Sequence, residues 1–81
     1  MNKKYVVESM AVPNGSMFCE MIKFNFYGSD VFQTSVYKSE NEEYKLVHKT
    51  YPTGKKRRAL TDFKKCCNNY LRKGIRIKNT G

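Results

Sequence analysis

The chain has 81 residues, of which 16 are Lys or Arg and 7 are Asp or Glu, so its net charge is +9 at pH 7. A chain this short forms one small domain and has no room for a large substrate cleft. Hydrophobic residues make up 40% of it, which argues against wholesale disorder. No stretch approaches the roughly 18 consecutive apolar residues of a membrane span, and no secretory signal is visible. We therefore expect a soluble domain with an anionic partner and no membrane contact.

The charge is distributed unevenly along the chain. Residues 1–43 carry four basic and six acidic side chains, whereas residues 44–81 carry twelve basic side chains and one acid, Asp62. This pattern predicts a nearly neutral scaffold in the first half and a cationic surface in the second.

The first half is typical of β-structure, because Val, Ile, Phe, Tyr and Thr dominate short runs separated by turn residues. In the second run, alternate positions predict that an apolar face looks towards the core; this face comprises Phe18, Ile22, Phe24 and Phe26. We expect four strands, at 5–12, 17–27, 31–38 and 44–51, with turns at 13–16 and 28–30 and an acidic loop at 39–43.

In the third predicted strand, Phe32, Thr34 and Val36 share one face. In the fourth, alternation places Tyr44, Leu46 and His48 on one face and Lys45, Val47 and Lys49 on the other; Pro52 ends this strand.

The period changes at Lys55, where apolar residues begin to recur at three and four positions, as on one face of a helix. This apolar stripe comprises Ala59, Leu60, Phe63, Cys66, Cys67, Tyr70 and Leu71. Thr53 is the expected N-terminal cap, and Gly74 and Ile75 are expected to close the C-terminus. The predicted fold is α+β, a four-stranded antiparallel sheet followed by one amphipathic helix on one face (β-β-β-β-α), in a single domain over 1–75 with a short basic tail at 76–81.

Cations crowd the start of the predicted helix, where the helix dipole disfavours positive charge by roughly 0.3–1 kcal/mol per residue at low salt. Arg58, Lys65 and Arg72 then repeat every seven residues, a rise of about 10.5 Å per step, and line up along the axis. Such a ladder suits successive phosphates of a nucleic acid. The predicted anion-binding residues on the helix are Lys55, Lys56, Arg57, Arg58, Lys64, Lys65, Arg72 and Lys73. A solvated lysine-rich helix face is the structural alternative.

The predicted sheet offers a second surface for single-stranded nucleic acid, because cations alternate there with tyrosines. It comprises Lys45, Lys49 and Tyr51, with Lys23 and Tyr27 alongside. Tyrosines that simply cover an open sheet face would give the same pattern. A shift of one residue in strand register reverses these assignments.

The sequence carries no recognisable catalytic or metal-binding constellation. Cys19, Cys66, Cys67 and His48 lack the paired spacing of a zinc site, and the three cysteines are odd in number, whereas a disulfide framework would need an even set. The acids near 40–43 have no histidine beside them, and the glycines form no phosphate-binding motif. We expect a non-enzymatic protein without metal or cofactor, in a reducing compartment such as the cytoplasm.

Two functions agree with these features. The first is a nucleic-acid-binding protein, for DNA or RNA, that contacts the backbone through the helix. The second is an inhibitor or adaptor, encoded by a phage or mobile element, whose helix docks on an acidic surface of a host protein. Uncovered edges of the first or third strand also allow a homodimer.

Overall fold

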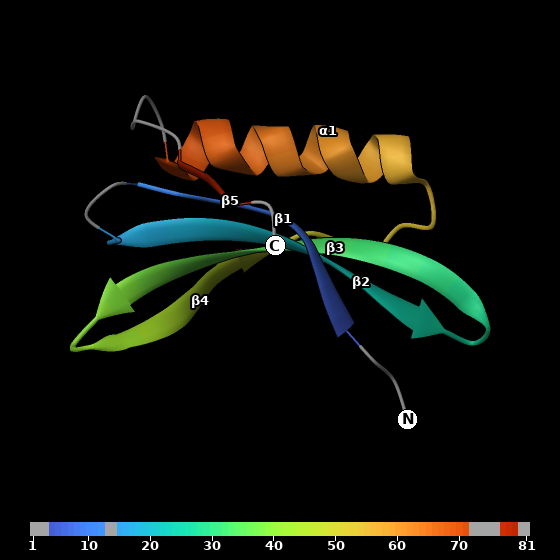
Figure 1. The fold of residues 1–81 in the computed structure, drawn as a ribbon, viewed down its shortest axis with the longest axis horizontal. Helices are drawn as coiled ribbons and strands as arrows, with labels where there is room; N and C mark the ends of the chain where they lie inside the picture. The colour runs from blue at the N-terminus through green and yellow to red at the C-terminus, as the bar shows by residue number, and fades with distance from the viewer. Residues whose placement is uncertain (1–3, 13–14, 72–76, 80–81) are drawn as a thin grey trace.

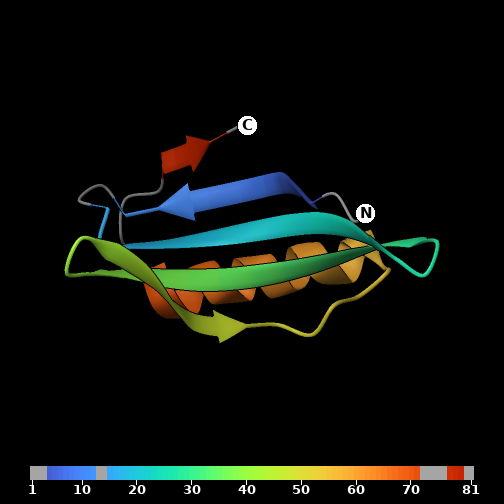
Figure 2. The same cartoon turned by 90° about the horizontal axis from the view of Figure 1, so that it is seen from below.

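The computed structural model describes residues 4–12, 15–71 and 77–79. Four antiparallel strands precede a helix that lies across one face of the sheet (Figure 1), which confirms the predicted α+β fold and β-β-β-β-α order. Seen from below, on the side of the sheet away from the helix, the sheet stands in front of the helix and no described segment covers it (Figure 2). The elements are β1 (Lys4–Ala11), β2 (Met17–Phe26), β3 (Ser29–Glu40), β4 (Glu43–Lys49), α1 (Lys56–Cys66), a π-helical segment η1 (Cys67–Leu71) and β5 (Ile77–Asn79).

Tight turns join the central strands. Tyr27 and Gly28 have φ values of 51° and 84°, and Asn41 and Glu42 have φ values of 53° and 65°. Two successive residues with positive φ match the type I′ turn, whose twist suits a two-residue hairpin. β3 therefore extends to Glu40, and the loop predicted over 39–43 is shorter than expected.

The fifth strand was not predicted from the sequence. Ile77–Asn79 lies within the predicted basic tail but pairs antiparallel with β1, which gives the sheet order β4-β3-β2-β1-β5. A three-residue strand is too short to produce a recognisable period. β3 lies between β2 and β4, so the expected exposed edge at the third strand is absent from the described sheet. β5 pairs only with Ser9–Ala11, so the earlier part of β1 keeps an uncovered edge there, and β4 forms the opposite edge.

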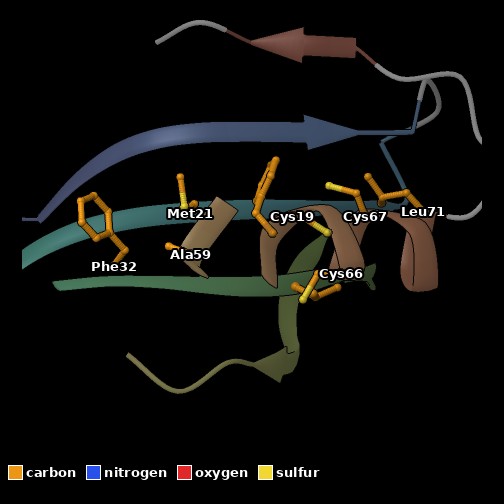
Figure 3. Close-up of a cluster of buried hydrophobic side chains, with 9 residues drawn as sticks. Cys19, Met21, Phe32, Ala59, Cys66, Cys67 and Leu71 are labelled. Carbon is orange, nitrogen blue, oxygen red and sulfur yellow. The ribbon is translucent and has the colours of Figure 1, made fainter. Parts of the chain in front are cut away.

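The core lies between the sheet and the helix (Figure 3). β2 contributes Cys19 and Met21, both fully buried, and the predicted stripe of α1 and η1 packs against them. The buried apolar residues are Cys19, Met21, Phe32, Val36, Ala59, Phe63, Cys66, Cys67 and Leu71, with Thr34 also buried beside them.

The predicted core face of β2 is wrong. Cys19 and Met21 alternate with the phenylalanines, so Phe18 and Phe24 belong to the open face and Phe26 is 54% exposed. Aromatic side chains on this open face contact one another. The Phe18 ring stacks on Tyr37 and meets Tyr44 edge to face, each at 4.9 Å between centroids. Alternation of apolar residues suggested the wrong face, because β2 contributes sulfur-containing side chains, Cys19 and Met21, to the space beneath the helix.

A β-bulge in β4 changes the side on which its last residues lie. Tyr37 of β3 pairs with Leu46, and its neighbour Val36 pairs with His48. Val47, between Leu46 and His48, is therefore the additional residue of the bulge. The bulge places His48 on the helix side and Leu46 on the open side. The prediction that Tyr44, Leu46 and His48 share one face is therefore wrong at His48.

The start of α1 differs from the predicted cap. Lys55 occupies the N-cap position and makes no side-chain capping hydrogen bond. The Thr53 hydroxyl instead accepts a hydrogen bond from the backbone N–H of Lys55 (3.2 Å). Thr53 also exchanges two backbone hydrogen bonds with Phe32, of 2.8 and 2.9 Å, which anchors the incoming loop to β3. The predicted C-terminal closure by Gly74 and Ile75 lies outside the described residues.

Candidate nucleic-acid interface

The N-terminal turn of α1 is entirely cationic. Lys55 is the N-cap, Lys56, Arg57 and Arg58 follow it, and the first turn contains no acidic residue. All four side chains are exposed. Because the free backbone N–H groups of this turn also carry partial positive charge, the electrostatic potential there favours an anion.

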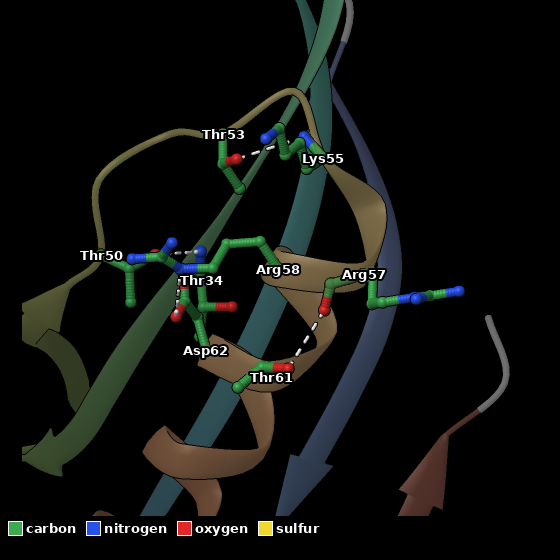
Figure 4. A network of polar contacts seen from close by, with 8 residues as sticks. All are labelled: Thr34, Thr50, Thr53, Lys55, Arg57, Arg58, Thr61 and Asp62. Atoms are coloured by element: carbon green, nitrogen blue, oxygen red, sulfur yellow. Dashed lines mark hydrogen bonds and ion pairs between the residues drawn. The ribbon is translucent and has the colours of Figure 1, made fainter.

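The cations of α1 form two rows. Arg57 and Lys64 lie seven residues apart on one side, and Arg58 and Lys65 do so on the other, with a rise of about 10.5 Å between the members of each row. Arg58 extends towards β4, whereas Arg57 points the other way (Figure 4). The helix therefore carries positive charge on two of its sides.

A groove separates α1 and η1 from β4 and the loop that follows it; we call it the α1–β4 groove. It consists of two adjoining cavities of about 430 and 280 Å³, both lined by His48, Thr50 and Asp62. Arg58 borders the larger cavity and Lys65 the smaller one. The other lining residues are Lys49, Tyr51, Pro52 and Thr53 in the first cavity and Cys66, Asn69 and Tyr70 in the second.

Hydrogen bonds hold the strand side of the groove in place. The backbone N–H of Thr50 donates to the Thr34 carbonyl (2.9 Å), and the Thr34 N–H donates to Thr50 Oγ1 (3.0 Å). The side-chain amide of Gln33 donates to the Thr50 carbonyl (2.8 Å). These bonds continue the pairing beyond the end of β4 and fix the wall opposite Arg58 (Figure 4).

Asp62 lies inside this otherwise cationic groove. Its Oδ1 is 3.6 Å from Nε of Arg58, and its side chain is only 23% exposed, against 71% for Arg58. Arg58 and Asp62 lie together beside Thr34 and Thr50 (Figure 4). One long contact leaves most of the acceptor capacity of the carboxylate unused by Arg58.

The acidic turn between β3 and β4 does not neutralise the helix. Within residues 4–12, 15–71 and 77–79, the ion pairs are Arg58–Asp62 and Lys45–Glu40, the latter at 3.2 Å. No described cation of α1 pairs with Glu40, Glu42 or Glu43. Apart from Arg58, which contacts Asp62, the described cations of α1 form no ion pair within the described residues.

The structure brings some predicted site residues together and separates others. Arg58 and Lys65 share the α1–β4 groove with Lys49 and Tyr51, which the sequence had assigned to a separate sheet surface. The rest of the helix surface carries Lys55, Lys56, Arg57 and Lys64. Lys45 lies at the distant β3–β4 turn, where it pairs with Glu40. The predicted site residues Arg72 and Lys73 lie outside the described residues.

The remaining sheet residues do not form the predicted stacking surface. Lys23 lies over the ring of Tyr5, with Nζ 5.8 Å from the centroid, on the helix side of the sheet. Tyr27 is 93% exposed in the β2–β3 turn. Sequence reasoning missed the groove residues His48, Thr50, Asn69 and Tyr70, and treated Asp62 only as an interruption of the positive charge.

The cysteines, Cys19, Cys66 and Cys67, are buried and form no disulfide. A hydrogen bond with Cys67, reinforced by burial, raises the pKa of the Cys19 thiol. Burial, with smaller contributions from Cys67 and Asp62, raises the pKa of Cys66. Both shifts favour the protonated form, which is a poor nucleophile and a poor metal ligand. Among the described residues, no three His, Cys, Asp or Glu side chains cluster in a way that suits a metal ion.

None of the described helices has the length and apolar character needed to cross a bilayer. Comparisons with protein-family models, curated proteins and solved structures find no match to this chain.

Proposed function

We propose that this protein binds nucleic acid, and that the cationic surface of α1 contacts the phosphate backbone. The observation that supports this most directly is the N-terminal turn of α1, where Lys55, Lys56, Arg57 and Arg58 face solvent without an acid in the turn. Like charges beside the positive end of a helix dipole destabilise the free protein, and a bound polyanion removes that cost.

The arrangement suits a polymer of phosphates better than one isolated anion. Each row of cations runs along α1, from Arg57 to Lys64 and from Arg58 to Lys65, so several phosphates of one strand can be neutralised together. Each neutralised phosphate releases condensed counterions, which makes the affinity depend steeply on salt.

Fluorescence polarisation with labelled 15-nucleotide probes, measured at several salt concentrations, tests this proposal. The double variant Arg57→Gln/Lys64→Gln removes two exposed charges that lie outside the α1–β4 groove. We expect its plot of log K against log salt to be shallower by about 1–2, as for the loss of about two phosphate contacts.

The matched control is Lys38→Gln/Lys45→Gln, which removes the same charge at the far end of β3 and β4, where the two exposed residues pair across the ladder. We expect it to keep the wild-type slope. Equal losses in both variants would contradict the assigned surface, and no binding of any probe at tens of micromolar protein in low salt would contradict nucleic-acid binding itself. A nuclease-resistant, stoichiometric acidic protein partner would then favour the inhibitor or adaptor function.

A further inference from the structure

The α1–β4 groove is an open depression in the surface that is large enough to hold one planar base. Its larger cavity, of about 430 Å³, falls within the roughly 300–1,000 Å³ of small-ligand pockets. A duplex keeps its bases paired and stacked and offers mainly phosphates to such a surface. A single strand can turn one base out of its stack and into a cavity.

The charges along the groove suit a nucleotide of a single strand. Arg58 and Lys65 are exposed cations at the two cavities, and Asp62 lines both. A phosphate beside Asp62 would meet a carboxylate that is largely shielded from water, which is unfavourable. Arg58 contacts Asp62 through Nε, so phosphates belong near Lys65 and the exposed end of the Arg58 side chain. A base beside Asp62 is held best if it donates hydrogen bonds to the carboxylate.

We propose that the α1–β4 groove receives one unstacked base of a single-stranded nucleic acid, and that Asp62 makes it prefer guanine. This inference rests on the proposed function. Guanine carries two neighbouring donors on its Watson–Crick edge, N1–H and N2–H₂, and the two oxygens of a carboxylate can accept both. Cytosine offers one amino group to a carboxylate. Thymine and uracil present a single N–H between two carbonyl oxygens, and these oxygens repel the carboxylate.

Tyr51 provides the stacking surface. It follows β4, lines the larger cavity and is 91% exposed, so its ring is free to receive a base. Aromatic rings beside cations are the usual means of holding single strands, because every base has a face that can stack. In the smaller cavity, the His48 ring stacks on Tyr70 with 5.5 Å between centroids.

The test compares fifteen-nucleotide thymidine probes that differ only at the central position, which holds T, C or G. We expect the wild-type protein to bind the G probe on the order of tenfold more tightly than the T probe, with the C probe between them. Asp62→Asn should reduce this ratio to about twofold or less while the probes still bind, because the carboxamide replaces one of the two acceptor oxygens with an NH₂ group, which would face a donor of guanine.

Glu40→Gln is the matched control, since it makes the same charge change at the Lys45 ion pair, far from the groove. It should keep the full preference for G. Tyr51→Ala should weaken the binding of all three probes equally. Because the Tyr51 side chain is exposed, we expect this variant to fold normally. Circular dichroism melts of each variant check the fold.

The outcomes separate the two proposals. Salt-dependent binding of all probes without a preference for G, or equally tight binding of a 15-base-pair duplex, overturns the base-pocket inference and leaves backbone binding intact. A preference for G that survives in Asp62→Asn also overturns the role of Asp62. Failure of every probe to bind at low salt contradicts the proposed function itself.

Discussion

The imidazole of His48 stacks on the ring of Tyr70, with centroids 5.5 Å apart and planes inclined by 22°. The contact ties an exposed edge strand to η1, and it exists because the β4 bulge turns His48 towards the helix. It also forms one wall of the α1–β4 groove, so the stability of the edge strand and the shape of the groove depend on the same pair.

His48→Ala should lower the free energy of unfolding by about 0.5–1.5 kcal/mol, because it removes an aromatic contact beyond simple burial. Urea unfolding followed by circular dichroism measures this. His48→Phe keeps a ring in place and should recover most of the loss. If His48→Ala and wild type share one midpoint, the stack does not stabilise β4.

Phe63→Ala should cost about 3–5 kcal/mol, since this α1 residue is 2% exposed and its truncation leaves a cavity beneath the helix. Phe26→Ala removes the same group from a side chain that is 54% exposed, and should cost far less. Thermal and urea denaturation of both variants check the assignment of faces. Similar losses would mean that the sheet is covered on the side of Phe26.

Thr34→Val should be neutral or stabilising by up to about 1 kcal/mol. Among the described residues, the buried hydroxyl of Thr34 has no hydrogen-bond partner, and valine has nearly the same shape without the polar group. Its hydrogen bonds with Thr50 use only backbone atoms of Thr34 and are retained. A clear loss of stability in urea unfolding would show that the hydroxyl is satisfied in solution.

The thiols should react slowly in the native protein. Because the folded-state pKa values of Cys19 and Cys66 are raised above the usual 9.0, the native state holds their protons more tightly than the unfolded state. Their contribution to stability is complete below about pH 9 and declines above it, by about 1.4 kcal/mol per pH unit for each thiol that ionises only on unfolding.

Alkylation by iodoacetamide at pH 8, followed by mass spectrometry, should therefore label these two cysteines only when urea is added. The corresponding stability measurement is urea unfolding at pH 8 and pH 9.5. The Cys19→Ala variant should show a smaller loss between these two pH values than wild type. Rapid labelling of the native protein would contradict the buried placement of the thiols.

Much of the cationic interface was predictable because it follows from local spacing. The seven-residue interval from Arg58 to Lys65 places both on one side of any regular helix. The meeting of these residues with Lys49 and Tyr51 was not predictable, because it depends on the path of the chain after β4 and on its hydrogen bonds to Thr34. Asp62 acquires its place in the groove through the same tertiary contact.

The sequence alone determined the order of strands and helix and the concentration of positive charge on the last helix, because periodicity and charge are local properties of neighbouring residues. Tertiary structure decided which face of β2 is buried, where His48 points and that Ile77–Asn79 joins the sheet. Alternation shows that a strand has two different faces, but only packing selects the covered one, and a bulge of one residue reverses the assignment.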